Sequence, residues 1–294
     1  MKAFDNLPTD LFEAYNNAIE RIETSRGGDK DLAMKVFSWI YYAQKTLKMD
    51  ELLEALVMED AEAEDDLEDI FPYMLAPGDI VECCKSLVSY DQSTRTVRFI
   101  HFTVEQFISR HLKERFPPAI MLATACLTYL KLAKFHQPCL DQTSMAARVD
   151  KYKFGCYASQ YWAFHVRGKL EESLDIQCDV FKLFEIDAQK DAVIQLETYS
   201  SSPWRGIHFT RDQTLLHVFA GKGLATFCRL VLRRLTNTEN ACVPFVIQRN
   251  ADTKVLNIFL CQNFQLMRRQ RMRTAVHLYI VRQKPEVSLS LSYC

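Results

Sequence analysis

The chain has 294 residues, of which 48% are hydrophobic, and its formal net charge is −1. This length predicts about two domains, and no apolar run approaches the roughly 20 residues of a membrane-spanning helix. The N-terminus lacks the apolar segment of a signal peptide, and the ten cysteines include no C-x-x-C pair, which argues against a zinc site. We therefore expect a cytoplasmic protein with reduced, buried thiols, no bound metal and no other cofactor.

Apolar residues recur at helical spacing in the first sixty residues. A first helix is expected from Asp10, a second from Asp29 and a short third from Asp50. Residues 50–69 contain eleven acids and no base, which indicates a solvated surface loop. Asp79 is expected to cap a fourth helix. The inward-facing residues of that helix would be Ile80, Cys83, Cys84, Leu87 and Val88.

Two short strands are predicted after the fourth helix, over about 87–90 and 95–102, around a turn at 91–94. Helices followed by such a hairpin have the order of a winged helix. The helix that would approach DNA carries Asp79 and Glu82 against Lys85 alone. Phosphates repel a net negative helix, so we do not expect DNA binding.

His101 lies at the end of the second predicted strand, two residues before a helix that Thr103 is expected to cap together with Gln106. The inward residues of this helix would be Val104, Phe107, Ile108 and Leu112. A polar ring at such a junction is either a packed core histidine or a group aimed at an anion, because helix N-termini attract anions. Both interpretations of His101 stay open at this point.

The chain beyond Pro117 is predicted to be helical as far as about residue 200, with helices over 120–133, 152–167 and 179–196. The second of these helices is dense in aromatic residues, namely Tyr152, Phe154, Tyr157, Tyr161, Trp162 and Phe164. Aromatic residues at helical spacing indicate a packed core more readily than a cofactor site.

Residues 214–224 read TLLHVFAGKGL and match the ankyrin signature. Thr214, His217 and Gly223 would serve the structural turns of the repeat and not catalysis. A single repeat cannot bury its own apolar face, and arrays normally need at least three. We therefore expect an incomplete array with an open apolar face. Its residues would be Leu216, Phe219, Leu230 and Val231.

The order of these segments resembles that of fungal NLR-like STAND NTPases of the NACHT–ankyrin type. The region after the NACHT module, with its GPI inositol-deacylase-type winged helix domain, is similar to LPTDLFEAYNNAIERIE, DLAMKVFSWIYYAQKTLKMDELLEALVME, DIVECCKSLVSYD and VRFIHFTVEQFI. The helical segment that joins this domain to ankyrin repeats is similar to ATACLTYLKL and YASQYWAFHVRG. No P-loop signature G-x-x-x-x-G-K-[ST] occurs in the sequence, so the NACHT module is absent from this chain.

The resemblance implies a mainly α protein with a small β-wing and four parts. These are an N-terminal helix that ends the NACHT-associated region (1–28), a winged helix domain (29–116), a helical linker domain (117–200) and a single ankyrin repeat (210–240). A basic tail (245–294) follows, which does not resemble the family. The tail holds eight bases against two acids. Four of these bases are arginines within residues 268–273, with no aromatic residue among them, which argues against nucleic-acid binding. We expect it to be either disordered or an artefact of the gene model.

The resemblance implies a non-catalytic regulatory and protein-interaction portion of a signalling protein. In NLR-type proteins a winged-helix histidine contacts the β-phosphate of ADP, and FIHFTVEQF resembles that setting, so His101 would sense nucleotide only beside a NACHT module. Partners would be proteins, bound through the ankyrin or helical region, together with that module. One alternative is a freestanding protein-binding adaptor. Another is a hydrolase using His101 or His165, but no G-x-S-x-G or H-E-x-x-H motif occurs.

Overall fold

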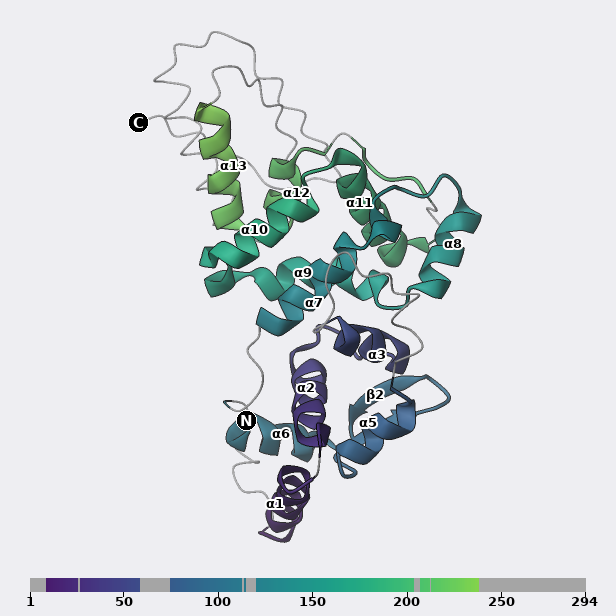
Figure 1. The fold of residues 1–294 in the computed structure, drawn as a ribbon, viewed down its shortest axis with the longest axis vertical. Coiled ribbons are helices and arrows are strands. Elements are labelled where there is room, and N and C mark those ends of the chain that lie inside the picture. Colours follow the sequence, from purple (N-terminus) through teal and green to yellow (C-terminus); the bar gives the residue numbers. More distant parts are fainter. Residues whose placement is uncertain are drawn as a thin grey trace, which may run out of the picture. The chain divides into compact units, whose positions relative to one another are not determined.

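The computed structural model describes residues 9–25, 27–58, 75–112, 114, 120–203, 207–211 and 213–237, which are mainly helical (Figure 1). The chain divides into two compact units, residues 1–211 and 212–294. Most of the acidic run and all of the basic tail lie outside the described residues. The predicted mainly α class with a small β-wing is confirmed.

The first unit begins with α1 (Thr9–Glu23), α2 (Asp29–Tyr42), α3 (Met49–Val57), α5 (Pro77–Cys83), β1 (Val88–Asp91), β2 (Thr96–Phe99) and α6 (Phe102–His111). It continues with α7 (Ile120–Lys131), the 3-10 helix η3 (Ala133–Phe135), α8 (Gln142–Lys151), α9 (Gly155–Val166), the 3-10 helix η4 (Gly168–Glu172), α10 (Leu174–Leu183) and α11 (Asp187–Ser201). The second unit contains α12 (Leu215–Gly221) and α13 (Ala225–Asn237).

Helices α2, α3 and α5 pack with the β1–β2 hairpin in the arrangement of a winged helix (Figure 1). Phe37 of α2 is fully buried, and its ring lies 6.0 Å from that of Phe99 in β2. Ile80 of α5 and Val97 of β2 are buried in the same domain. Burying an apolar side chain of this size contributes about 1.5–3 kcal/mol, so the alternating residues of β2 and one face of each helix hold the domain together.

The hairpin is antiparallel, and its register pairs Val88 with Phe99 and Asp91 with Thr96. The turn is stabilised by Asp91, whose Oδ1 accepts hydrogen bonds from the backbone N–H and the hydroxyl of Ser93, at 2.9 and 2.7 Å. These donors favour the charged carboxylate and lower the pKa of Asp91 to about 2. The predicted turn at 91–94 is therefore confirmed to within one residue.

The fourth helix and the second strand are both shorter than predicted. Asp79 is the third residue of α5 and not its cap, and its carboxylate accepts from the Ala76 N–H at 2.8 Å. The helix ends after Cys83 because Lys85 and Ser86 adopt positive φ angles of 46° and 68°, and left-handed residues end helices. Strand β2 stops at Phe99, so His101 is not part of the strand.

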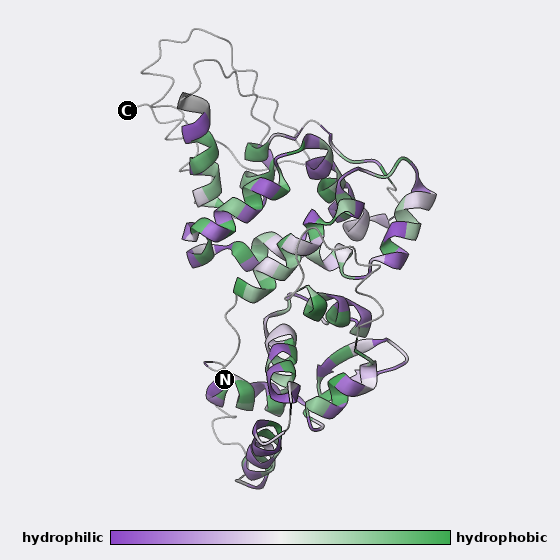
Figure 2. Ribbon diagram, viewed as in Figure 1, coloured by the Kyte–Doolittle hydropathy of each residue, from purple (hydrophilic) through white to green (hydrophobic). Residues whose placement is uncertain are grey.

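Helices α7 and α9 pack closely together at the centre of the helical region that follows. Figure 2 shows apolar residues along α7. Eight of its nine positions from Leu122 to Leu130 are buried, and Thr124 is the exception. A helix that is apolar on every side belongs in a core. The predicted core role of the aromatic residues is confirmed for Tyr152, Phe154, Tyr157 and Trp162, whereas Phe164 is half exposed.

One predicted helix in this region is two helices in the structure, and one observed helix, α8, is not predicted by the sequence. The segment 179–196 forms parts of α10 and α11, because the chain turns at Phe184, which is buried, and leaves Ile186 53% exposed. The spacing of apolar residues cannot show such a break when both halves are apolar. Helix α8 has only Met145 buried, so its sequence carries too weak an apolar periodicity to be recognised.

Candidate functional site

His101 lies between β2 and α6, and its side chain caps α6. The ring Nδ1 accepts a hydrogen bond from the backbone N–H of Thr103 at 3.3 Å, and it lies 2.8 Å from the Thr103 hydroxyl. The cap residue is thus His101 and not Thr103, because the imidazole reaches the second amide of the helix as a serine or aspartate side chain would. The predicted inner face of the helix is confirmed, since Val104, Phe107 and Ile108 are buried.

The ring of His101 is exposed, so the interpretation as a packed core histidine is wrong. Its neighbours Ile100 and Phe102 are 56% and 51% exposed, and the Phe102 ring lies 4.3 Å from the imidazole. The strand-to-helix junction therefore presents a polar ring with a large apolar side chain on either side. Such a surface is suited to contact with another molecule.

A second cluster of polar side chains joins the winged helix to the helical region through Glu54 of α3. This side chain is buried, and its carboxylate accepts hydrogen bonds from the Tyr129 hydroxyl at 2.5 Å and from the backbone N–H groups of Phe154 and Lys153 at 2.8 and 3.1 Å. One carboxylate of α3 is thus hydrogen-bonded both to Tyr129 of α7 and to the backbone at the start of α9. Charge-assisted bonds of this kind are about twice as strong as neutral ones.

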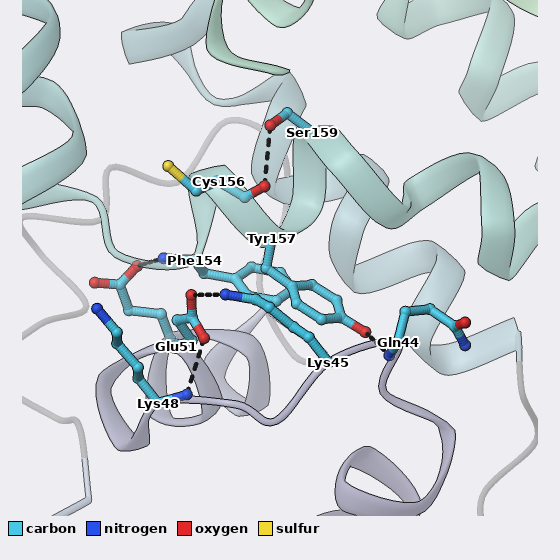
Figure 3. A network of polar contacts seen from close by, with 9 residues as sticks. Gln44, Lys45, Lys48, Glu51, Phe154, Cys156, Tyr157 and Ser159 are labelled. Carbon is cyan, nitrogen blue, oxygen red and sulfur yellow. Dashed lines mark hydrogen bonds and ion pairs between the residues drawn. The ribbon is translucent and has the colours of Figure 1, made fainter. Parts of the chain in front are cut away.

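Glu51, one turn earlier on α3, organises the loop beside this contact (Figure 3). Its carboxylate accepts from Lys45 Nζ at 2.6 Å and from the backbone N–H of Lys48 at 2.9 Å. The Tyr157 hydroxyl of α9 accepts from the backbone N–H of Gln44 at 3.2 Å. The loop that precedes α3 is therefore held by its own helix and by the helical region at the same time.

Aromatic rings fill the space beside these polar groups. Trp39 of α2 is fully buried and makes edge-to-face contacts with Phe154 and Tyr157, at centroid distances of 5.5 and 6.1 Å. His165 lies 2.9 Å from the Tyr157 hydroxyl, and burial lowers its pKa to about 4. A histidine with this pKa is neutral at physiological pH, so it serves as a hydrogen-bonding partner of Tyr157 and not as a cation.

Residues 19–116 match the winged helix domain of GPI inositol-deacylase. No curated protein and no solved structure matches the chain. The match extends from the last turns of α1 to just beyond α6, and it includes His101 and Glu54. The predicted resemblance to this winged helix domain is therefore confirmed over these residues.

Sequence reasoning identified His101 but missed the contacts of Glu54. A signal was present, because Glu54 lies in the run Leu52-Leu53-Glu54-Ala55-Leu56, where an acid interrupts apolar residues on every side of a short helix. Charged residues are almost never fully buried unless they are paired. The partners of Glu54 lie about 75 and 100 positions further along the chain, and no local pattern could indicate them.

Thr214, His217 and Gly223, the three residues of the ankyrin signature, lie in or beside α12. Thr214 is the N-cap of α12, and its hydroxyl lies 2.8 Å from His217 Nδ1, which also accepts from the Thr214 N–H at 3.1 Å. Gly223 has a φ of 72° and lies between α12 and α13, a conformation that is costly for other residues. These residues stabilise the helix pair and do not converge on a site.

Within the described ranges, no group of three or more potential metal ligands occurs, and no helix is long and apolar enough to cross a membrane. Cys83 and Cys84 are buried thiols, with their sulfur atoms 3.8 Å apart. The described candidate sites are therefore the exposed junction at His101 and the buried contacts of Glu54.

Proposed function

We propose that this chain is the non-catalytic regulatory and protein-interaction portion of a STAND/NLR-like signalling protein. In this role the winged helix domain responds to the nucleotide state of a NACHT module and passes the change to the helical region, while α12 and α13 belong to an ankyrin part that binds proteins. The match of residues 19–116 to a winged helix domain carries the proposal, together with the resemblance of the flanking segments.

The contacts of Glu54 support transmission from the winged helix domain to the helical region. If α3 moved alone, a buried carboxylate and three donors from Tyr129, Lys153 and Phe154 would lose their partners. Each unsatisfied buried group costs about 1–3 kcal/mol. A displacement of α3 is therefore expected to carry α7 and α9 with it.

The exposed ring of His101 supports the sensing role. An imidazole N–H that donates to a phosphate oxygen forms a charge-assisted hydrogen bond, which contributes about 1.5–3 kcal/mol when it is desolvated. That bond would favour the closed state, in which the NACHT module retains ADP. Losing it would shift the balance between closed and open states by roughly ten- to a hundredfold.

The charges on α5 favour a protein partner over DNA. Within Pro77–Cys83 the charged residues are Asp79 and Glu82, and Lys85 lies beyond the end of the helix. A helix that enters the major groove gains from Lys and Arg contacts to phosphates. The acids on α5 would oppose that approach.

The test is His101→Ala in a protein with a NACHT module fused upstream. We expect activation without ligand, whereas binding of protein partners by the unfused chain should not change. His136→Ala is the control, because His136 is an exposed histidine of the helical region that bonds the Lys131 carbonyl at 2.9 Å. A fused His101→Ala protein that stays silent would contradict the sensing role.

A further inference from the structure

A series of hydrogen bonds links Tyr15 of α1, through Thr103, to His101. The Tyr15 hydroxyl lies 2.7 Å from Thr103 Oγ1, which in turn lies 2.8 Å from His101 Nδ1. Tyr15 is only 9% exposed, and its ring lies 5.5 Å from that of Phe107 on α6. The hydroxyl of Tyr15 is therefore held against α6 by packing and does not depend on the hydrogen bond alone.

The direction of each hydrogen bond in this series follows from the cap. His101 Nδ1 accepts from the backbone N–H of Thr103, so it carries a lone pair and no hydrogen. The Thr103 hydroxyl must then donate to Nδ1, because two lone pairs 2.8 Å apart would repel each other. With its only hydrogen used, the Thr103 hydroxyl can act toward Tyr15 only as an acceptor, through one of its two lone pairs, and Tyr15 is the donor.

We infer that Tyr15 and Thr103 are positioning residues that hold the neutral ring of His101 in the tautomer with its hydrogen on Nε2. The exposed imidazole, whose centroid lies 4.3 Å from that of the Phe102 ring, then carries an N–H donor at Nε2. This donor is matched to an anionic oxygen, such as that of a phosphate. The inference deepens the proposed function and rests on it for the identity of the acceptor.

The experiment uses the whole chain with ¹⁵N-labelled histidine, studied by long-range ¹H–¹⁵N correlation at mildly alkaline pH. His101→Gln identifies the signals of His101. In the unmodified chain we expect Nδ1 to show the shift of an unprotonated acceptor and Nε2 that of a protonated nitrogen. Thr103→Val should lower the ratio of the Nε2–H to the Nδ1–H tautomer by about tenfold, the factor that corresponds to about 1.4 kcal/mol.

Three further variants separate positioning from folding. Thr103→Ser keeps the hydroxyl and should restore the ratio, and Tyr15→Phe should lower it by a smaller factor. Tyr41→Phe is the matched control, because the Tyr41 hydroxyl lies 3.0 Å from the hydroxyl of Ser109, which is on α6 like Thr103. This substitution should leave the tautomer ratio unchanged.

A predominant Nδ1–H form in the unmodified chain, or a ratio that Thr103→Val does not alter, would overturn the inference. Neither result depends on nucleotide. A correct tautomer together with a silent His101→Ala fusion would instead contradict the sensing role alone.

Discussion

Burial and hydrogen bonding act in opposite directions on Glu54. Burial favours the protonated acid, the bonds from Phe154, Tyr129 and Lys153 favour the carboxylate, and burial prevails, so the pKa of Glu54 is raised above 4.5. Burial likewise raises the pKa of the Tyr129 phenol well above its usual value, and the adjacent carboxylate of Glu54 raises it further. The phenol therefore stays protonated and donates. The contact between the two regions thus contains an acid whose charge costs free energy.

Removing this carboxylate should destabilise the fold more than removing its neighbour. Glu54→Ala leaves three donors without their acceptor, and we expect the free energy of unfolding to fall by about 3 kcal/mol or more. Glu51→Ala is the control, because Glu51 is also buried but its hydrogen bonds within the described residues are to Lys45 and Lys48 of the winged helix domain. We expect a loss of about 1 kcal/mol there. Equal losses in urea unfolding would contradict a special role for Glu54.

The raised pKa of Glu54 also predicts how stability depends on pH. The folded state binds this proton more tightly than the unfolded state, so the contribution is fully present below the unfolded pKa of 4.5 and is lost as the pH rises through the folded pKa. The stability of the unmodified chain relative to Glu54→Gln should therefore decrease from about pH 4.5 towards neutrality. Urea unfolding of both proteins across this range measures the difference. A difference that is constant with pH would contradict the assignment.

At the level of elements, α12 and α13 form a small helix pair with its own apolar contacts. Phe219 and Phe227 are fully buried with ring centroids 5.2 Å apart. Leu216 and Val231 are also buried, whereas Leu230 is half-buried. The expected open apolar face is therefore wrong for Leu216, Phe219 and Val231. Helices this short depend on packing for their stability, since isolated helices below about 12–15 residues are marginal in water.

We predict faster hydrogen exchange in this helix pair than in the winged helix domain. One repeat offers a small core, and stacked repeats stabilise one another, so the backbone amides of α12 and α13 should exchange before those of α2. Mass spectrometry of peptic fragments measures this order. Protection equal to that of α2 would mean that the pair is stabilised as strongly as the winged helix domain.

The cap at Thr214 should set the stability of α12. Thr214→Ala removes a hydroxyl that bonds His217 and the first turn of the helix, and a lost cap costs about 1 kcal/mol. Exchange of the α12 amides should accelerate about fivefold, the factor that this free energy implies. Thr226→Ala on α13 is the control, because that hydroxyl accepts from Arg229 and caps no helix start. A matching acceleration in the control would indicate a general loss of packing.

At the scale of the whole molecule, the winged helix domain and the helical region belong to one compact unit that ends near Arg211. Limited trypsin digestion should therefore leave a resistant fragment that ends at Arg205 or Arg211. In Glu54→Ala the hydrogen bonds to Tyr129, Lys153 and Phe154 are lost, and cleavage should increase at Lys113 or Arg115, between the two regions. A fragment ending near residue 115 in the unmodified chain would contradict this prediction.

The chain is also predicted not to bind ATP tightly, because its sequence contains no glycine loop and lysine of a P-loop. Titration with a fluorescent ATP analogue measures this. Saturable binding at about micromolar concentration would contradict a non-catalytic portion.

Local patterns in the sequence determined most of the elements of this protein. The apolar periodicity of α2, the hairpin turn at Asp91 and the Thr214 cap each depend on residues only a few positions apart, so they can be recognised without a structure. Periodicity also placed His101 at a strand-to-helix junction, just before the helix that is α6. It could not decide whether the ring was buried, because burial depends on neighbours contributed by the whole fold.

Only the tertiary structure decided which polar groups meet. Glu54 contacts residues about 75 to 100 positions away, and Tyr15 reaches Thr103 across 88 positions. Hydrogen bonds of this kind depend on atoms that packing brings within about 3 Å. An acid within an apolar run of the sequence shows only that this acid requires some partner. The identity of that partner, and with it the tautomer of His101 and the charge of Glu54, follows from how the helices pack.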